Sequence, residues 1–244
     1  MDMGMFIKSD VGVPQGGPIS PLLANIMLNE LEQRLEEWGY RFVRYADDLM
    51  IFTKSKRAGQ RQFQRVSKFI EGKLKLKINK EKTSITRLNQ IKYLGYGFYR
   101  IKGKCRFRVH PKSITKLKDK LRETTGRSNG MSIEGRKTKL NQIIRGWVRY
   151  FKLADMKAIM QSIDEWLRRR IRMITWKRWK KVRTKFENLR KLGVAKEKAW
   201  EWANTRKSYW HTANSWILAT TLTNARFEKQ GYLSLLKYYL EVRV

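Results

Sequence analysis

Two adjacent carboxylates form the sharpest chemical feature of this sequence. Asp47 and Asp48 fall between two short β-prone runs, residues 41–45 and 49–53, so we expect them at the tip of a β-hairpin. The flanking runs are apolar, and two like charges side by side are costly to bury unless a cation compensates them. A divalent metal would do so, and oxygen ligands with substrate phosphates suit Mg²⁺. An ordinary polar turn is the alternative, and these residues alone leave both open.

The helices and strands that must position this tip are predicted from the spacing of apolar residues and from the positions of Gly, Pro and capping residues. Residues 1–18 are rich in Gly and Pro and predict a loop, and Ser20-Pro21 predicts the start of a helix that Gly39 ends. A second helix is expected from Ser55 to about residue 74, and strands are expected within residues 84–109. From Pro111 onward the period is helical, with helices near 111–125, 132–152, 155–181, 195–207 and 216–229. The expected fold class is α+β, with an α+β part over residues 1–110 and an all-α part over residues 111–244.

Composition points to a polyanionic partner. Among 244 residues there are 55 Lys and Arg against 21 Asp and Glu, a formal net charge of +34, and the excess is concentrated in residues 51–200. Self-repulsion on this scale favours a nucleic-acid partner over simple surface decoration. One cysteine and two histidines exclude a disulfide and a Cys- or His-rich metal site. Without a long apolar run or a signal segment, we expect a cytoplasmic protein with no membrane partner.

Four ordered segments carry a family resemblance. They are residues 12–29 (GVPQGGPISPLLANIMLN), 42–48 (FVRYADD), 76–83 (LKINKEKT) and 93–95 (YLG). In order and spacing they resemble the later motifs of reverse transcriptases, most closely the group II intron-encoded reverse transcriptase/maturases. Residues 145–151 (RGWVRYF) and 166–172 (WLRRRIR) resemble the thumb, or maturase domain X, of that family. The resemblance implies a partial right-hand palm over residues 1–110 and a helical thumb over residues 111–244.

The resemblance also implies roles for individual residues. Catalysis and ligation of Mg²⁺ are expected of Asp47 and Asp48, and Lys82 is expected to contact the triphosphate or protonate the leaving pyrophosphate. The implied nucleotide- and template-binding residues are Gln15, Gly16, Gly17, Tyr45, Ala46 and Asn79. The implied primer grip is Tyr93, Leu94 and Gly95, which could equally form a core strand. Lys82 could equally be one more basic surface residue, and Gly16-Gly17 a flexible start to the helix.

The basic residues in the helical half of the sequence predict an RNA-binding surface. Arginine pairs bidentately with phosphate, and the densest basic cluster surrounds Trp166 and Trp176. Most of the tryptophans, including Trp166 and Trp200, are expected in the core rather than stacked on bases. The expected RNA-binding residues are Arg168, Arg169, Arg170, Arg172, Lys177, Arg178, Lys180 and Lys181. For Arg169, Arg170 and Arg172 the alternatives are solvated surface side chains without a partner, or internal salt bridges to Asp164 and Glu165.

The resemblance implies an RNA-directed DNA polymerase and maturase that promotes intron splicing and mobility, acting on intron RNA, primer-template and dNTP. Only 11 residues precede Gly12, so the fingers and the palm strand with a third metal-binding Asp are expected to be missing. We therefore expect weak or no polymerase activity from this chain alone, with a two-metal Mg²⁺ site that lacks its third carboxylate. A separate fingers chain could complete it. The alternatives are an RNA-binding maturase without polymerase activity and a degenerate remnant.

Overall fold

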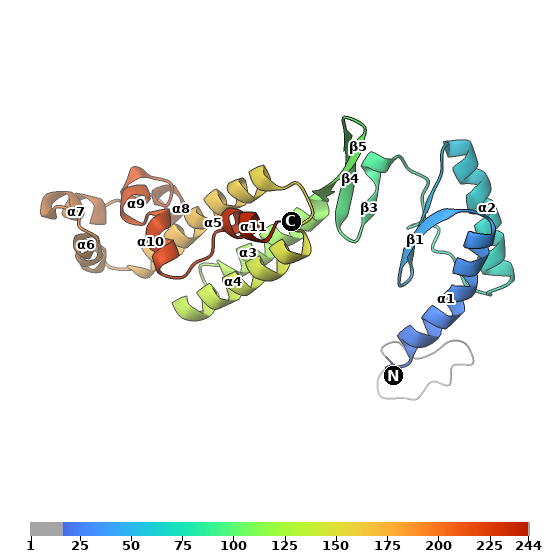
Figure 1. Cartoon of the computed structure of the whole chain (residues 1–244). Helices are drawn as coiled ribbons and strands as arrows, with labels where there is room; N and C mark the ends of the chain where they lie inside the picture. Colours follow the sequence, from blue (N-terminus) through green and yellow to red (C-terminus); the bar gives the residue numbers. More distant parts are fainter. Residues whose placement is uncertain (1–16, 244) are drawn as a thin grey trace. The chain divides into compact units, whose positions relative to one another are not determined.

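The computed structural model describes residues 17–243, and the chain divides into two compact units between Arg87 and Leu88 (Figure 1). Unit 1 is an α+β unit with a two-stranded sheet, and unit 2 joins a three-stranded sheet to a set of helices. The α+β fold class expected from the sequence is confirmed. None of the described helices is long and apolar enough to cross a membrane.

Unit 1 contains helix α1 (Ser20–Glu37), the hairpin of β1 (Arg41–Tyr45) and β2 (Asp48–Phe52), and helix α2 (Lys56–Gly72). Proline in the first turn starts α1, and Gly39 follows its end with a φ of +67°, a left-handed conformation that favours glycine. The Ser55 hydroxyl caps α2 by accepting a hydrogen bond from the backbone N–H of Ala58. Local signals in the sequence therefore set both helix starts.

The core of unit 1 is small. Leu31 and Leu35 of α1 pack with Val66 of α2 and with Leu74, and partly buried residues from the hairpin surround them. One face of α1 remains exposed although it is apolar; it consists of Ile19, Leu22, Leu23, Ile26 and Met27. A two-stranded hairpin is marginally stable by itself, so the packing of α1 and α2 provides its support.

The sheet of unit 2 follows a short 3-10 turn, η1 (Leu88–Gln90). Its strands are β3 (Lys92–Tyr93), β4 (Tyr96–Ile101) and β5 (Lys104–Val109), all antiparallel and in the order β3-β4-β5. Each of the two turns has two consecutive residues with positive φ, Leu94-Gly95 and Lys102-Gly103. Turns of this kind match the twist of the strands that they join.

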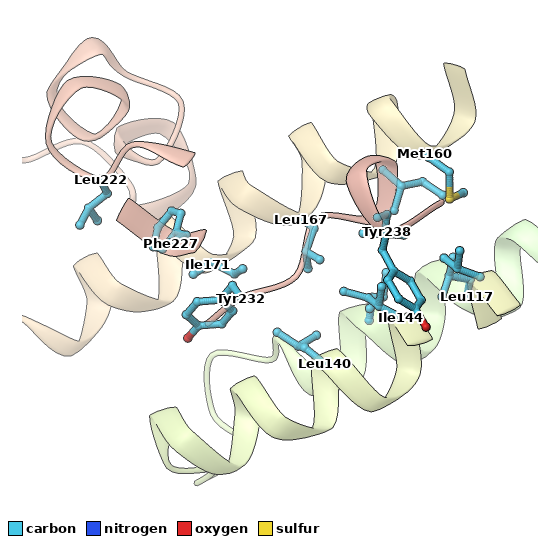
Figure 2. Close-up of a cluster of buried hydrophobic side chains, with 14 of the residues drawn as sticks. Leu117, Leu140, Ile144, Met160, Leu167, Ile171, Leu222, Phe227, Tyr232 and Tyr238 are labelled. Atoms are coloured by element: carbon cyan, nitrogen blue, oxygen red, sulfur yellow. The ribbon is translucent and has the colours of Figure 1, made fainter. Parts of the chain in front are cut away.

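Nine described helices complete unit 2. Their bounds are α3 (Pro111–Thr124), α4 (Ile133–Tyr150), α5 (Lys157–Arg178), α6 (Val182–Lys191), α7 (Lys196–Ala203), α8 (Tyr209–Thr212), α9 (Trp216–Thr221), α10 (Asn224–Lys229) and α11 (Leu235–Val242). The main core lies where α3, α4, α5 and α11 meet, and Figure 2 shows Ile144 of α4 and Tyr238 of α11 within it. The core continues along α5 to Phe227 of α10.

The helical expectations need correction in the last third of the chain. Residues 182–191 and 235–242 form helices that the sequence analysis missed, and the helix expected over 216–229 is two short helices. The change from strands to helices falls at Pro111, as expected, but the compact units divide at residue 87 instead. The physical reason is that Tyr96 of β4 packs on Phe151, and the backbone N–H of Asp155 donates to the Phe107 carbonyl of β5. These contacts join the sheet to the helices.

Candidate functional site

The paired aspartates lie at the tip of the β1–β2 hairpin. Tyr45 pairs with Asp48 across the ladder, so Ala46 and Asp47 form the two-residue turn, and Ala46 has a φ of +52°. Both carboxylates are exposed, and Tyr45 is 63% exposed beside them. The hairpin therefore presents two adjacent carboxylates and an aromatic ring to solvent.

Arg44 fixes this tip to helix α1. Its Nε donates to Glu32 Oε1 at 2.6 Å, and its Nη1 donates to Asn25 Oδ1 at 3.1 Å and to the Ala46 carbonyl at 2.8 Å. The Arg44 side chain is 12% exposed, so the ion pair with Glu32 is shielded from solvent more than a surface pair. One guanidinium thus joins the turn to the helix and restrains the backbone directly before Asp47.

Sequence reasoning missed Arg44 and Glu32. Arg44 lies inside a β-prone run, one residue before Tyr45, where a surface charge would have been the default interpretation. Its partners Asn25 and Glu32 are seven residues apart, which places them on the same face of α1. That spacing, together with an arginine next to a polar turn, was the signal that could have found them.

The expected template-binding loop is only partly described. Gln15 and Gly16 lie outside the described residues. Gly17 is half-buried just before α1, and its carbonyl accepts a hydrogen bond from the backbone N–H of Ser20. Gly17 therefore lies at the start of α1, the helix whose Asn25 and Glu32 side chains accept hydrogen bonds from Arg44.

Asn79 and Lys82 are joined by a local turn. The Asn79 side-chain oxygen accepts from the backbone N–H of Lys82 at 3.1 Å, and the Asn79 carbonyl accepts from the Thr83 hydroxyl at 2.8 Å. Asn79 therefore shapes the turn with its own side chain, and Lys82 is exposed on it. A role for Lys82 in contacting phosphate stays a prediction.

The segment expected to grip the primer is the β3–β4 turn of unit 2. The Leu94 carbonyl accepts from the Tyr150 hydroxyl at 2.9 Å, and the Gly95 carbonyl accepts from the Ser113 hydroxyl at 3.0 Å. A Cβ at Gly95 would lie 3.0 Å from Phe151 Cζ, and its φ is +81°. Tyr93, Leu94 and Gly95 therefore form a turn packed on the helices, and a role in holding a primer stays a prediction.

Four of the arginines of α5 do not form the surface that the sequence predicted. Arg168 is 2% exposed and donates to the Leu233 carbonyl at 2.9 Å, so its assignment to the RNA-binding surface is wrong. Burial lowers the pKa of Arg168, although nearby Asp164 opposes that shift. Asp164 itself accepts from the backbone N–H groups of Leu235 and Leu236 at the start of α11. Arg168 is therefore not part of an exposed basic surface, because its side chain is buried and donates its hydrogen bond to the Leu233 carbonyl.

The next arginines are also committed to structure. Arg169 donates to the Trp210 carbonyl, and Arg170 donates to both the hydroxyl and the carbonyl oxygen of Thr125. Arg172 donates to the Leu222 carbonyl at 2.9 Å and to Asn224 Oδ1 at 3.1 Å. A carbonyl that ends a helix or turn needs a donor, and these guanidinium groups supply it.

The exposed cations of this region lie just beyond. Arg178, at the end of α5, and the following Lys180 and Lys181 are exposed, whereas Lys177 is half-buried and donates to the Arg127 carbonyl at 2.9 Å. Trp200, expected in the core, is 57% exposed on α7. The basic surface predicted from the sequence is thus displaced toward the C-terminal end of α5.

The hairpin tip supplies only part of a metal site. Carboxylate oxygens at the tip are chemically suited to Mg²⁺. Within residues 17–243, however, the structure holds no group of three or more His, Cys, Asp or Glu side chains that could bind a metal. Asp47 and Asp48 therefore offer a partial ligand set that substrate phosphates or further carboxylates would have to complete.

Two segments of the chain match models of known protein families. Residues 4–98 match the model of reverse transcriptase (RNA-dependent DNA polymerase), which gives the class of the part that carries the hairpin. Residues 114–193 match the model of the group II intron maturase-specific domain, and this match covers most of α3 and all of α4, α5 and α6. The chain therefore combines, in this order, a segment similar to reverse transcriptases and a segment similar to the group II intron maturase-specific domain.

One curated relative is Protein YkfC of Escherichia coli (strain K12). It is 33% identical over 123 residues, a match that covers 36% of this chain and 32% of that protein. The match thus spans about a third of the length of the relative.

Proposed function

We propose that this protein acts as the reverse transcriptase and maturase of a group II intron. In this role it copies RNA into DNA from dNTP on a primer-template, and it binds intron RNA to promote splicing and mobility. The observation that carries the proposal is the hairpin tip, where two adjacent aspartates are exposed and Arg44 joins the turn between them and β1 to α1. The order of the two family matches along the chain supports it.

Mg²⁺ is the cofactor that this proposal requires. Asp47 and Asp48 would hold it, and the bound ion would supply positive charge to the reacting phosphates. Arg44 contributes by fixing the turn, because its hydrogen bond to the Ala46 carbonyl restrains the backbone directly before Asp47. Within the described residues these two carboxylates form a partial ligand set, and a further carboxylate from elsewhere in the complete polymerase would complete it.

An RNA-binding maturase without polymerase activity is the second candidate. It is favoured by the exposed cations at the end of α5, which lie within the maturase-specific match and need no carboxylates to bind RNA. The two candidates differ in their dependence on Asp47.

The test compares Asp47→Asn with Glu36→Gln, which removes an exposed carboxylate from α1. Both variants and the unchanged chain are assayed for primer extension, alone and mixed with a polypeptide that supplies fingers and early palm, and for splicing of a group II intron. We expect extension only in the mixture, and we expect Asp47→Asn to abolish it while RNA affinity and splicing persist. Splicing without extension in any mixture would favour the maturase alone. Extension that survives Asp47→Asn would refute the assignment of the tip.

A further inference from the structure

Two neighbouring hollows on unit 2 share one arginine. The first has a cavity volume of about 430 Å³ and lies between the start of α4 and the end of α5; its cationic lining consists of Arg127, Arg136, Lys177, Arg178 and Lys180. The second, also about 430 Å³, is lined by Arg122, Arg127, Trp166, Arg170, Met173 and Trp210. Arg127, in the loop between α3 and α4, borders both.

Positive charge in these hollows is poorly compensated. Neither lining contains a carboxylate, and the ion pair of Arg122 with Asp119 is solvent-exposed. Burial lowers the pKa of Arg170, and the positive charges of Arg122 and Arg127 lower it further. A cluster of cations that repel one another is destabilising in the free protein, and a bound polyanion would relieve that repulsion.

The second hollow adds flat aromatic surface to this charge. The Arg169 guanidinium lies 3.9 Å from the ring centroid of Trp210, and the Arg170 guanidinium lies 5.2 Å from that of Trp166. Both tryptophans are half-buried, so each indole is held in place and still reaches the hollow. Nucleobases stack on aromatic side chains and on guanidinium planes, and both kinds of surface are present here.

The loop that carries Arg127 is fixed before any ligand binds. Asn129 donates to the carbonyls of Glu123 and Thr124 at the end of α3 and accepts from Arg136 at 2.7 Å. Lys177 of α5 donates to the Arg127 carbonyl. A preformed loop loses little conformational entropy on binding, which favours affinity.

We propose that these two hollows bind one unpaired RNA nucleotide together with its neighbouring phosphates. The base stacks against Trp166 and Trp210, and the phosphates lie on Arg127, Arg178 and Lys180. The base must be unpaired because a base inside a duplex has no free face to offer. This inference rests on the proposed RNA binding and names the RNA element that one part of the protein recognises.

The test uses the full chain and a single-stranded uridine oligonucleotide of about four residues, a length typical of short single-strand sites. We expect Trp210→Leu to weaken the affinity about 5- to 150-fold, the range typical for loss of one base–aromatic stack. Trp210→Phe should retain most of the affinity. Trp200→Ala, which removes an exposed tryptophan outside both hollows, is the matched control and should bind like the unchanged chain.

A second pair of variants keeps the test decisive if Trp210→Leu fails to fold. Arg127→Gln should lower the slope of log K against log salt by about 0.7, the value for one lost single-strand phosphate contact, whereas Arg206→Gln on an exposed loop should not. Equal affinity of all variants for the oligonucleotide, or equal losses in the Trp200 and Arg206 controls, would overturn the proposal.

Two further ligands separate this inference from the proposed function. A mixed-sequence RNA duplex that is long enough to stay paired should bind without dependence on Trp210, and a deoxyuridine oligonucleotide of the same length as the uridine one should bind more weakly. Equal binding of the deoxy form would overturn the choice of RNA over DNA. If the unchanged chain binds group II intron RNA and the variants do so equally, the nucleotide site is wrong and RNA binding stands. If the unchanged chain binds no RNA, the proposed function itself fails.

Discussion

Replacing Arg172 with glutamine should destabilise unit 2, although the same change at Arg178 on the same helix should not. Arg172 donates two hydrogen bonds, to the Leu222 carbonyl and to Asn224 Oδ1, which tie α5 to the start of α10. Burial lowers the pKa of Arg172, and the nearby Arg168 charge acts in the same direction, so the guanidinium is partly desolvated. Arg178 is exposed at the last turn of α5.

The expected magnitude follows from those two bonds. A hydrogen bond from a charged donor contributes about 1.5–3 kcal/mol, and glutamine can replace one of the two in part, so we expect a loss of about 2–3 kcal/mol. For a chain of this size that corresponds to a fall in melting temperature of about 4–12 °C. An exposed substitution such as Arg178→Gln should stay within about 0.5 kcal/mol.

Thermal unfolding followed by tryptophan fluorescence is the appropriate assay, because every tryptophan except Trp38 lies in unit 2. RNA binding at several KCl concentrations supplies the second measurement. Arg178→Gln should flatten the salt slope by about 0.7–0.9, and Arg172→Gln should leave it unchanged. If Arg172→Gln melts like the unchanged chain and flattens the slope, Arg172 contacts phosphate and our account of the α5 arginines is wrong.

Three further outcomes are expected. Arg44→Met keeps the aliphatic stem but leaves the Glu32 carboxylate without its partner, so it should lower primer extension by the complete polymerase more than it lowers RNA affinity. Unchanged extension would show that the contacts of Arg44 with Glu32 and the Ala46 carbonyl do not position the hairpin tip. Gly95→Ala should cost about 1–3 kcal/mol in thermal unfolding, because the new Cβ meets Phe151 in a left-handed turn; a neutral result would contradict the tight packing. Burial and nearby cations lower the pKa of His110, whose neutral Nδ1 caps α3. The stability that His110 contributes is therefore complete above about pH 6.5, the pKa of a free histidine, and it is lost as the pH falls through the lower pKa of the folded state. His110→Asn, which can cap without titrating, should flatten that part of the stability–pH curve, and an unaltered curve would assign the pH dependence elsewhere.

Much of unit 1 was predictable because its signals are local. A proline and a glycine bound α1, Ser55 caps α2, and alternating β-prone residues around Asp47-Asp48 specify a hairpin whose register needs only its own turn. The clamp from Arg44 to Glu32 was not predictable in the same way. It depends on how the hairpin lies against α1, which no short window of sequence contains.

In unit 2 the sequence determined that a basic helical region follows Pro111, with α5 as its longest described helix. It did not determine which of that helix's arginines face solvent. Arg168 meets the carbonyl of Leu233, 65 residues away, and Arg172 meets that of Leu222, 50 residues away. Helical period gives the face on which a side chain lies, but only the folded chain brings a distant backbone carbonyl to that face. An arginine with such a carbonyl is satisfied inside the protein, and one without it, such as Arg178, stays exposed; that choice belongs to the tertiary structure.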